Sequence, residues 1–105
     1  MHSINCAKGK LVALTPEAKV KAKVRRLLEA ASVYYFMPAT GGYGRSGVPD
    51  IVGCCDGKFF AIECKAGKGK TTALQDNELR KIKEAGGIAL VINEDNIMDV
   101  SLIWT

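Results

Sequence analysis

Histidine is nearly absent from this sequence, and its cysteines lack the spacing of a metal site. The only histidine is His2, and the four cysteines form no C-x-x-C motif: Cys6, Cys54, Cys55 and Cys64. Structural zinc sites are built from closely spaced cysteines and histidines, so the sequence argues against a zinc-binding module. Reduced cysteines inside strands act as small apolar residues instead.

Long apolar runs are missing as well. No segment approaches the roughly 20 consecutive apolar residues of a membrane-spanning helix. The first residues also lack the apolar core of a secretory signal. We therefore expect an intracellular protein without a membrane partner, located in the cytoplasm or nucleoid, or in the host cytoplasm if a phage encodes it.

The composition is that of a single globular domain covering residues 1–105. Hydrophobic residues make up 48% of the chain and charged residues 25%, which suits a protein with a modest core. The formal net charge is +4. A mildly basic chain favours a polyanionic partner such as DNA.

Residues 47–65, GVPDIVGCCDGKFFAIECK, have the pattern of a β-hairpin. Asp56-Gly57 favours a type I′ turn, because both central residues of that turn need positive φ. A two-residue turn determines the register of the two strands, and this register places Asp50 opposite Glu63. Lys65 lies two residues beyond Glu63 and therefore projects from the same face.

Two acids and a lysine on one face indicate a cation site. Directly opposed like charges are destabilising, so Asp50 and Glu63 are a poor choice for packing alone. Hard carboxylate oxygens suit Mg²⁺ or Mn²⁺. The alternative is a solvated outer face, in which a bulge at the turn slips the register and moves Glu63 to the other side.

These residues carry a family resemblance. Pro49-Asp50, a gap of twelve residues and Glu63-Cys64-Lys65 are similar to the signature of the PD-(D/E)XK nucleases. The neighbouring segment 47–52, Gln75, and Ala85-Gly86-Gly87 before an apolar run resemble the VRR-NUC branch of that superfamily. The resemblance covers about residues 15–93.

The resemblance implies a single VRR-NUC-like domain with a restriction-endonuclease-like fold. That fold is an α/β/α sandwich with a mixed central sheet, and the order of the expected elements favours the same class. The resemblance also implies that Asp50 and Glu63 hold Mg²⁺ or Mn²⁺, helped by the Cys64 carbonyl and Glu17. Lys65 would orient or activate the attacking water, and Gln75 would lie at the edge of the catalytic centre.

The first expected helix begins at Thr15-Pro16-Glu17, with threonine as N-cap and proline at the first helical position. An apolar stripe follows at helical spacing: Val20, Val24, Leu27, Leu28 and Ala31. Glu17 lies on this stripe, so it either reaches the acidic site or merely complements the helix dipole. The other faces carry cations that are either solvated or form a track for DNA phosphates: Lys19, Lys21, Lys23, Arg25 and Arg26.

Two loops carry the expected DNA contacts. In the glycine-rich loop 39–47, Arg45 can clamp a phosphate, Tyr43 can stack on a base or sugar, and Ser46 lies beside them. The alternative for this loop is a flexible turn. Lys68 and Lys70 follow the hairpin and either contact phosphates or are simply solvated. Their GKT fragment is not a nucleotide-binding P-loop, because that motif requires glycine at the position of Cys64.

The remaining elements complete the expected layout. A first strand is predicted over 33–37, and a second helix from Thr72 to about Ala85, with Gln75 either capping it or joining the site. The apolar run 88–92 predicts a central buried strand. Residues 100–104 predict an edge strand or a segment packed on the core, where Trp104 contacts either the core or a partner.

The sequence therefore predicts a divalent-metal-dependent DNA endonuclease. The resemblance further implies a homodimer acting on branched DNA such as a four-way junction, where two symmetric sites would make two nicks. One alternative is a flap or general nuclease that needs a partner protein. Another is a catalytically silent DNA-binding module, against which the intact set of Asp50, Glu63 and Lys65 argues.

Overall fold

The computed structural model describes residues 14–39 and 44–105. The expectations for Tyr43, His2 and Cys6 lie outside these residues. The elements follow in the order α1 (Pro16–Ala30), β1 (Tyr34–Phe36), β2 (Ile51–Cys55), β3 (Lys58–Cys64), α2 (Ala73–Glu84), β4 (Ile88–Ile92) and the 3₁₀ helix η2 (Ile97–Ile103). Within the described part of the chain, no helix is long and apolar enough to cross a membrane.

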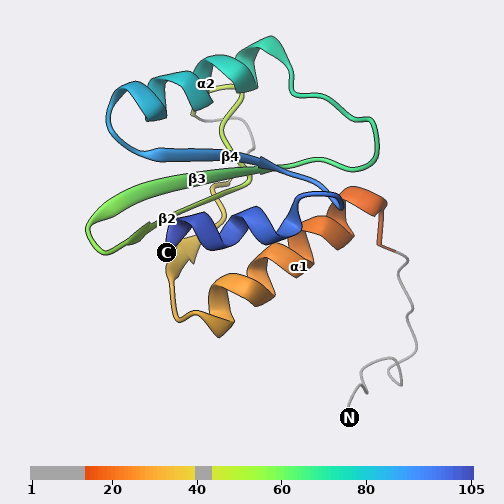
Figure 1. Ribbon diagram of the computed structural model, residues 1–105. Helices are drawn as coiled ribbons and strands as arrows, with labels where there is room; N and C mark the ends of the chain where they lie inside the picture. The colour runs from red at the N-terminus through yellow and green to blue at the C-terminus, as the bar shows by residue number, and fades with distance from the viewer. Residues whose placement is uncertain (1–13, 40–43) are drawn as a thin grey trace.

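One mixed sheet forms the middle layer of the fold. Its strand order is β1-β2-β3-β4, with β1, β2 and β3 antiparallel and β4 parallel to β3. Helix α2 covers one face of the sheet, whereas α1 and η2 cover the other (Figure 1). This confirms the predicted α/β/α sandwich with a mixed central sheet.

The turn between β2 and β3 sets the register as predicted. Asp56 has φ 51° and Gly57 has φ 79°, so both central residues adopt the positive φ that a type I′ turn requires. Cys55 pairs with Lys58 and Ile51 with Ile62. Continued by one residue, this register brings Asp50 across from Glu63.

The main core lies between α1 and the sheet. Val24, Leu28, Ile51, Phe60, Ile62, Cys64, Ile92 and Val100 are its fully buried side chains. Burying a leucine, isoleucine or phenylalanine side chain stabilises the fold by about 1.5–3 kcal/mol each. Along β3, Phe60, Ile62 and Cys64 face this core, so alternation turns Ala61 and Glu63 toward α2. Glu63 is thus buried on the face opposite the main core.

Strand β4 is an edge strand, and its predicted central position is wrong. Among the residues that the structure describes it pairs only with β3, and Val91 is 41% exposed. One face of the run IALVI is covered along its length, because Ile88, Leu90 and Ile92 pack on the main core. The other face is covered in part: Ala89 is buried on the α2 side, and Val91 is exposed. An apolar run therefore does not by itself indicate a place in the middle of a sheet.

The chain ends in a helix that packs on the core rather than in an edge strand. Of the two alternatives for residues 100–104, core packing is confirmed and the strand is wrong. Val100 and Ile103 are buried and Ile97 packs against the same core. Their spacing of three matches the 3.0 residues per turn of a 3₁₀ helix, which puts all three on one side. Trp104 also packs partly against the core.

Candidate active site

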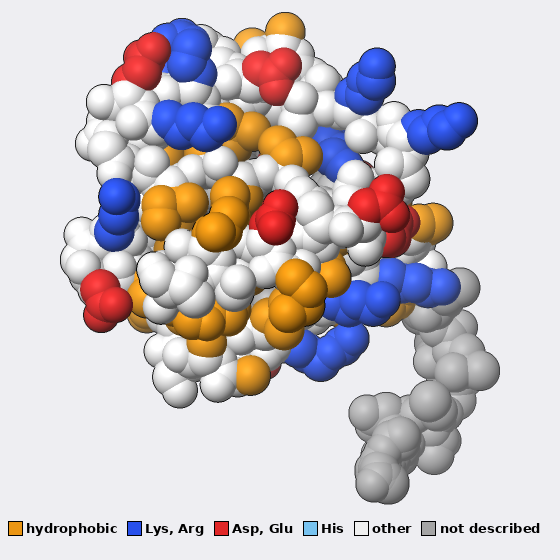
Figure 2. Space-filling view, in the orientation of Figure 1, with side chains coloured by type: hydrophobic (Ala, Val, Ile, Leu, Met, Phe, Trp, Pro, Cys, Tyr) orange, Lys and Arg blue, Asp and Glu red, His pale blue; other side chains and the backbone are white. Residues whose placement is uncertain are grey.

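The predicted acids meet at one end of the sheet. Asp50 directly precedes β2, Glu63 is the second-last residue of β3, and Lys65 follows that strand. The carboxyl ends of β3 and β4 and the start of α1 point to this end, at the right of Figure 1. Figure 2 shows lysine and arginine side chains gathered around the same end, with acidic side chains between them.

Both carboxylate oxygens of Asp50 have partners. Oδ2 accepts a hydrogen bond from the Cys64 backbone N–H at 2.9 Å. Oδ1 lies 3.6 Å from the Nζ of Lys21 on α1. The contact with the Cys64 amide carries the β2–β3 pairing one step beyond the strands, and it places the Asp50 carboxylate beside Glu63.

Glu63 is the most deeply buried charged residue in the described chain, with 2% of its surface exposed. Its Oε2 accepts a hydrogen bond from Gln75 Nε2 at 3.0 Å and lies 3.5 Å from Lys65 Nζ. Its Oε1 is buried and has no hydrogen-bond partner among the described residues. A buried carboxylate oxygen without a partner carries its full desolvation penalty, which calls for a proton or a cation.

Burial, which has the largest effect, and the negative charge of Asp50 together raise the pKa of Glu63 to about 7. The charge of Glu17 acts in the same direction, whereas Lys65 lowers the pKa. At neutral pH the metal-free site therefore resists holding two ionised carboxylates. A divalent cation would reverse this preference, because it favours the ionised form of both acids.

This raised pKa predicts a pH-dependent stability in EDTA. Below about pH 4.5 Glu63 is protonated in both states, and above about pH 7 it is ionised in both. Between these values only the folded state keeps the proton, so stability falls as pH rises. Glu63→Gln removes this dependence. The free energy of unfolding of the variant should therefore rise by about 1–3 kcal/mol relative to that of wild type as the pH is raised from about 5 to about 8.

Urea unfolding of wild type and Glu63→Gln at about pH 5 and at about pH 8 measures this change in relative stability. The quantity compared is the difference in free energy of unfolding between wild type and Glu63→Gln at each pH. The contributions of all other titrating groups are the same in both proteins and cancel in this difference. An equal difference at both pH values would show that Glu63 ionises in the folded protein as it does in the unfolded chain.

Gln75 caps α2 and contacts Glu63 at the same time. Its backbone N–H donates to Thr72 Oγ1 at 3.2 Å, and its Oε1 accepts from the Thr72 N–H at 2.9 Å, which completes a capping box. Its Nε2 remains for Glu63. The start of α2 thus orients the side chain that holds Glu63 in place.

Helix α1 brings charged side chains to the site from the other layer. Glu17 is half-buried, and its negative charge raises the pKa of Glu63, so it lies within electrostatic reach of the acids. Lys21, one turn later, contacts Asp50. From the sequence alone, Lys21 was only one of several cations on this helix. Its spacing of four residues from Glu17 was the available signal, since residues i and i+4 share a helix face.

Cys64 contributes its backbone rather than its thiol. Burial raises the pKa of the thiol to about 12, so the side chain stays protonated and packs as an apolar group. Its N–H orients Asp50. The role predicted for its carbonyl in metal binding stays a prediction.

The loop before Asp50 is attached to α2. At Gly47, which has φ 80°, an added Cβ would lie 2.6 Å from the backbone of Leu74, so only glycine permits this approach. Arg45 donates to Glu78 Oε1 from Nε at 3.3 Å and from Nη2 at 3.2 Å. The Arg45 side chain is nevertheless 67% exposed. Ser46, the next residue, is exposed as well.

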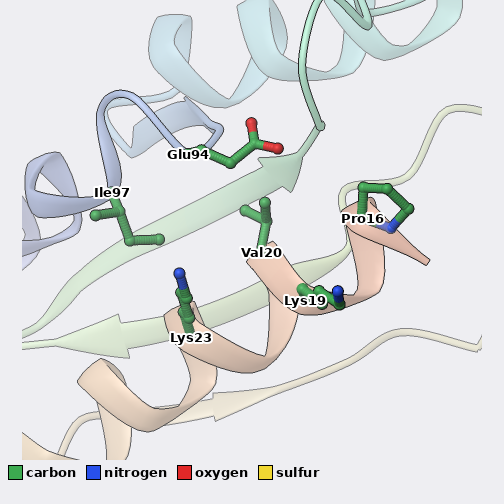
Figure 3. Close-up of a pocket in the computed structure, with 6 residues that line it drawn as sticks. All are labelled: Pro16, Lys19, Val20, Lys23, Glu94 and Ile97. Carbon is green, nitrogen blue, oxygen red and sulfur yellow. The ribbon is translucent and has the colours of Figure 1, made fainter. Parts of the chain in front are cut away.

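The remaining cations separate into distinct groups. Lys68 and Lys70 are exposed in the loop between β3 and α2. On α1, Arg25 hydrogen-bonds to Tyr35, away from the site. Lys19 and Lys23 line a cavity of about 270 Å³ between α1 and the segment after β4, with Glu94 and Ile97 on its other side (Figure 3). The α1 cations therefore do not form one continuous track.

The acids fit a divalent metal ion. Among residues 14–39 and 44–105, no three His, Cys, Asp or Glu side chains lie close enough to enclose an ion by themselves. Mg²⁺ is commonly held by one or two carboxylates, with waters and substrate phosphates completing its shell. Asp50 and Glu63 supply that number, and the unpartnered Glu63 Oε1 offers a free oxygen ligand.

Comparison with known proteins agrees with this arrangement. The model of the archaeal Holliday junction resolvase family matches residues 15–92. The match runs from the N-cap of α1 to the last residue of β4 and includes Asp50, Glu63 and Lys65. No curated protein resembles the chain closely enough to count as a match.

Proposed function

The chain belongs to the archaeal Holliday junction resolvase family, and we propose that it is a divalent-metal-dependent endonuclease that hydrolyses phosphodiester bonds in branched DNA. The observation that carries this proposal is that Asp50 lies across from buried Glu63, whose Oε1 has no hydrogen-bond partner within residues 14–39 and 44–105, beside Lys65. The narrower assignment to the VRR-NUC branch, which rests on the motif around Asp50 and the Glu63-Cys64-Lys65 strand, stays a prediction, because the model that matches is that of the resolvase family.

The proposed metal ligands are Asp50 and Glu63, with the Cys64 carbonyl and Glu17 as further candidates. Mg²⁺ or Mn²⁺ suits these hard oxygen donors. When bound, the ion would polarise the phosphate and neutralise negative charge that develops during hydrolysis. Gln75 would keep Glu63 oriented toward the ion through the bond to Oε2.

Lys65 is the proposed catalytic cation. Its Nζ lies 3.5 Å from Glu63, and its side chain is only 13% exposed, so its charge acts in a partly desolvated environment. There a fixed positive charge stabilises a developing phosphorane-like anion more strongly than it would in water. It would also orient the water that attacks phosphorus as the bond to the leaving oxygen breaks.

The proposed DNA contacts come from the segments that precede Asp50 and follow Lys65 in the chain: Arg45, Ser46, Lys68 and Lys70, together with Tyr43, which lies outside the described residues. A guanidinium has five N–H donors, and Arg45 uses two groups for Glu78, so it can also bind a phosphate. Lys68 and Lys70 are exposed in the loop that follows Lys65, within a short stretch of chain from the catalytic strand.

Replacing both Lys68 and Lys70 by Gln should weaken the binding of all DNA substrates by about the same factor, whatever their sequence or shape. Each lost phosphate contact reduces the slope of log K against log salt by about 0.9, so the double variant should lose about 1–2 units. Fluorescence anisotropy in EDTA at several salt concentrations measures this slope. Lys81 and Lys83, in the last turn of α2, give the matched control with the same charge change. Equal slopes for both double variants would remove Lys68 and Lys70 from the interface.

We further propose that the enzyme acts as a homodimer. Two sites related by a two-fold axis would suit two symmetric nicks in a four-way junction. Tyr34, Phe36 and Phe59 support a second chain, because these large apolar side chains are 68%, 52% and 46% exposed. Exposed apolar surface of this kind often contacts another chain. Light scattering of the purified chain measures the mass directly.

A cleavage assay tests the proposed function. The full chain is incubated with Mg²⁺ or Mn²⁺ and a labelled four-way junction, a flap, or a plain duplex of matched sequence. Preferential metal-dependent nicking of the junction is the expected result. Equal cutting of flap or duplex would indicate a general or flap nuclease, and binding without cutting would indicate a silent DNA-binding module.

A further inference from the structure

Asp50 and Glu63 are treated differently by the residues around them. Each has its own ammonium group: Lys21 Nζ lies 3.6 Å from Asp50 Oδ1, and Lys65 Nζ lies 3.5 Å from Glu63 Oε2. Glu63 keeps a second oxygen that has no partner in the described part of the chain, whereas both oxygens of Asp50 are engaged. A cation that enters the site can therefore bind Glu63 Oε1 directly, whereas at Asp50 it must first displace Lys21.

Lys21 is the more exposed of the two lysines. Its side chain is 29% exposed, against 13% for Lys65. Its contact with Asp50 is a single ion pair from a flexible four-carbon stem, and such partly exposed pairs are weak. The Cys64 N–H, by contrast, holds the other oxygen of Asp50 from the backbone. Lys21 can therefore leave while Asp50 stays oriented.

We propose that Lys21 is a positioning residue that competes with the divalent cation for Asp50. Its ammonium balances the Asp50 charge while no metal is bound and must release the carboxylate before a cation can bind it. Lys21 thereby lowers the affinity of the site for metal. The inference rests on the proposed metal-dependent function.

The competition has two linked consequences. Without Lys21, Asp50 and Glu63 repel each other with less compensation, so the metal-free protein should be less stable. The same loss makes the site more negative, and metal binding should tighten. Metal binding stabilises the folded state by linkage, so saturating Mn²⁺ should remove the difference in stability.

Isothermal titration of Mn²⁺ into the metal-free full chain tests the inference directly. Lys21→Met and Lys21→Gln should each bind Mn²⁺ about 5- to 30-fold more tightly than wild type, because a unit positive charge next to the site is removed. Lys21→Arg keeps the charge and should stay within about twofold of wild type. In EDTA, the two neutral variants should show a lower urea midpoint, and saturating Mn²⁺ should close this gap.

Lys23→Met is the matched control. It removes the same charge from the same helix, but Lys23 lines the cavity beside Ile97 (Figure 3) instead of contacting Asp50. Screening at physiological salt should limit its effect on the Mn²⁺ affinity to about twofold. Equal affinities for Lys21→Met, Lys21→Gln and Lys23→Met would overturn the inference, and so would a wild type that binds no Mn²⁺.

Junction cleavage by the wild type distinguishes this result from the proposed function. Cleavage together with unchanged Mn²⁺ affinity in the Lys21 variants would leave the nuclease standing and remove the role of Lys21. Tighter Mn²⁺ binding in those variants without any cleavage by the wild type would support the role of Lys21 and refute the proposed nuclease activity.

Discussion

Asp50→Asn and Glu63→Gln should each lower the rate of metal-dependent junction cleavage by about 10³-fold or more. Each substitution removes one of the two carboxylate charges proposed to hold the ion, and metal ions contribute several kcal/mol to such reactions. The shape of each side chain is preserved, so the bond from Cys64 N–H to residue 50 can still form. Single-turnover cleavage at saturating protein measures the rate.

The controls separate lost chemistry from lost folding or binding. Circular dichroism and urea unfolding should show folded variants, and DNA affinity in EDTA should stay within about threefold of wild type, since phosphates contact other residues. Glu84→Gln removes an acid that is 62% exposed and should cleave normally. Undiminished cleavage by either site variant would refute the assignment of Asp50 or Glu63 to the metal site.

Lys65→Met should have the next largest effect, a loss of about 10²–10⁴-fold in cleavage rate at saturating metal and DNA. Removing a positioned charge that stabilises the transition state, or a group that activates the water, typically costs this much. The loss should appear in kcat rather than in KM, because Lys65 would act on the developing charge. Single-turnover rates across a series of DNA concentrations separate the two terms.

Lys65→Arg and Lys68→Met are the informative companions to this variant. Arginine keeps the charge beside Glu63, so Lys65→Arg should recover part of the rate if the role is electrostatic, and none if Lys65 must release a proton. Lys68→Met removes a nearby exposed lysine and should change the rate by less than about threefold. A normal kcat for Lys65→Met would show that Lys65 has only a structural role, as the ion-pair partner of buried Glu63.

Local rules were sufficient for the parts of the site that lie within one hairpin. The Asp56-Gly57 turn determined the register, and strand alternation predicted Asp50, Glu63 and Lys65 on one face. In the structure Lys65 forms an ion pair with Glu63, and Asp50 accepts a hydrogen bond from the Cys64 N–H next to it. The same holds for the capping box at Thr72 and Gln75. Each of these features depends on backbone geometry over a few residues.

Local sequence rules could not predict the contacts between separate helices, strands and loops. The bond from Gln75 to Glu63 depends on how α2 lies over β3, and the pair of Arg45 and Glu78 depends on the close approach at Gly47. The edge position of β4 could not be read from its apolar run, because an edge strand with one covered and one partly covered face shows the same pattern as a central strand.

The sequence by itself determined the α/β/α class, the hairpin with its facing acids and the N-caps of α1 and α2, because turn chemistry and side-chain periodicity act along the chain. Only the tertiary structure decided that Lys21 contacts Asp50, that Glu63 is buried with an unpartnered oxygen, and that its pKa is raised to about 7. These properties arise from burial and from charges on different layers. They exist only once α1 and α2 have packed against the same end of the sheet.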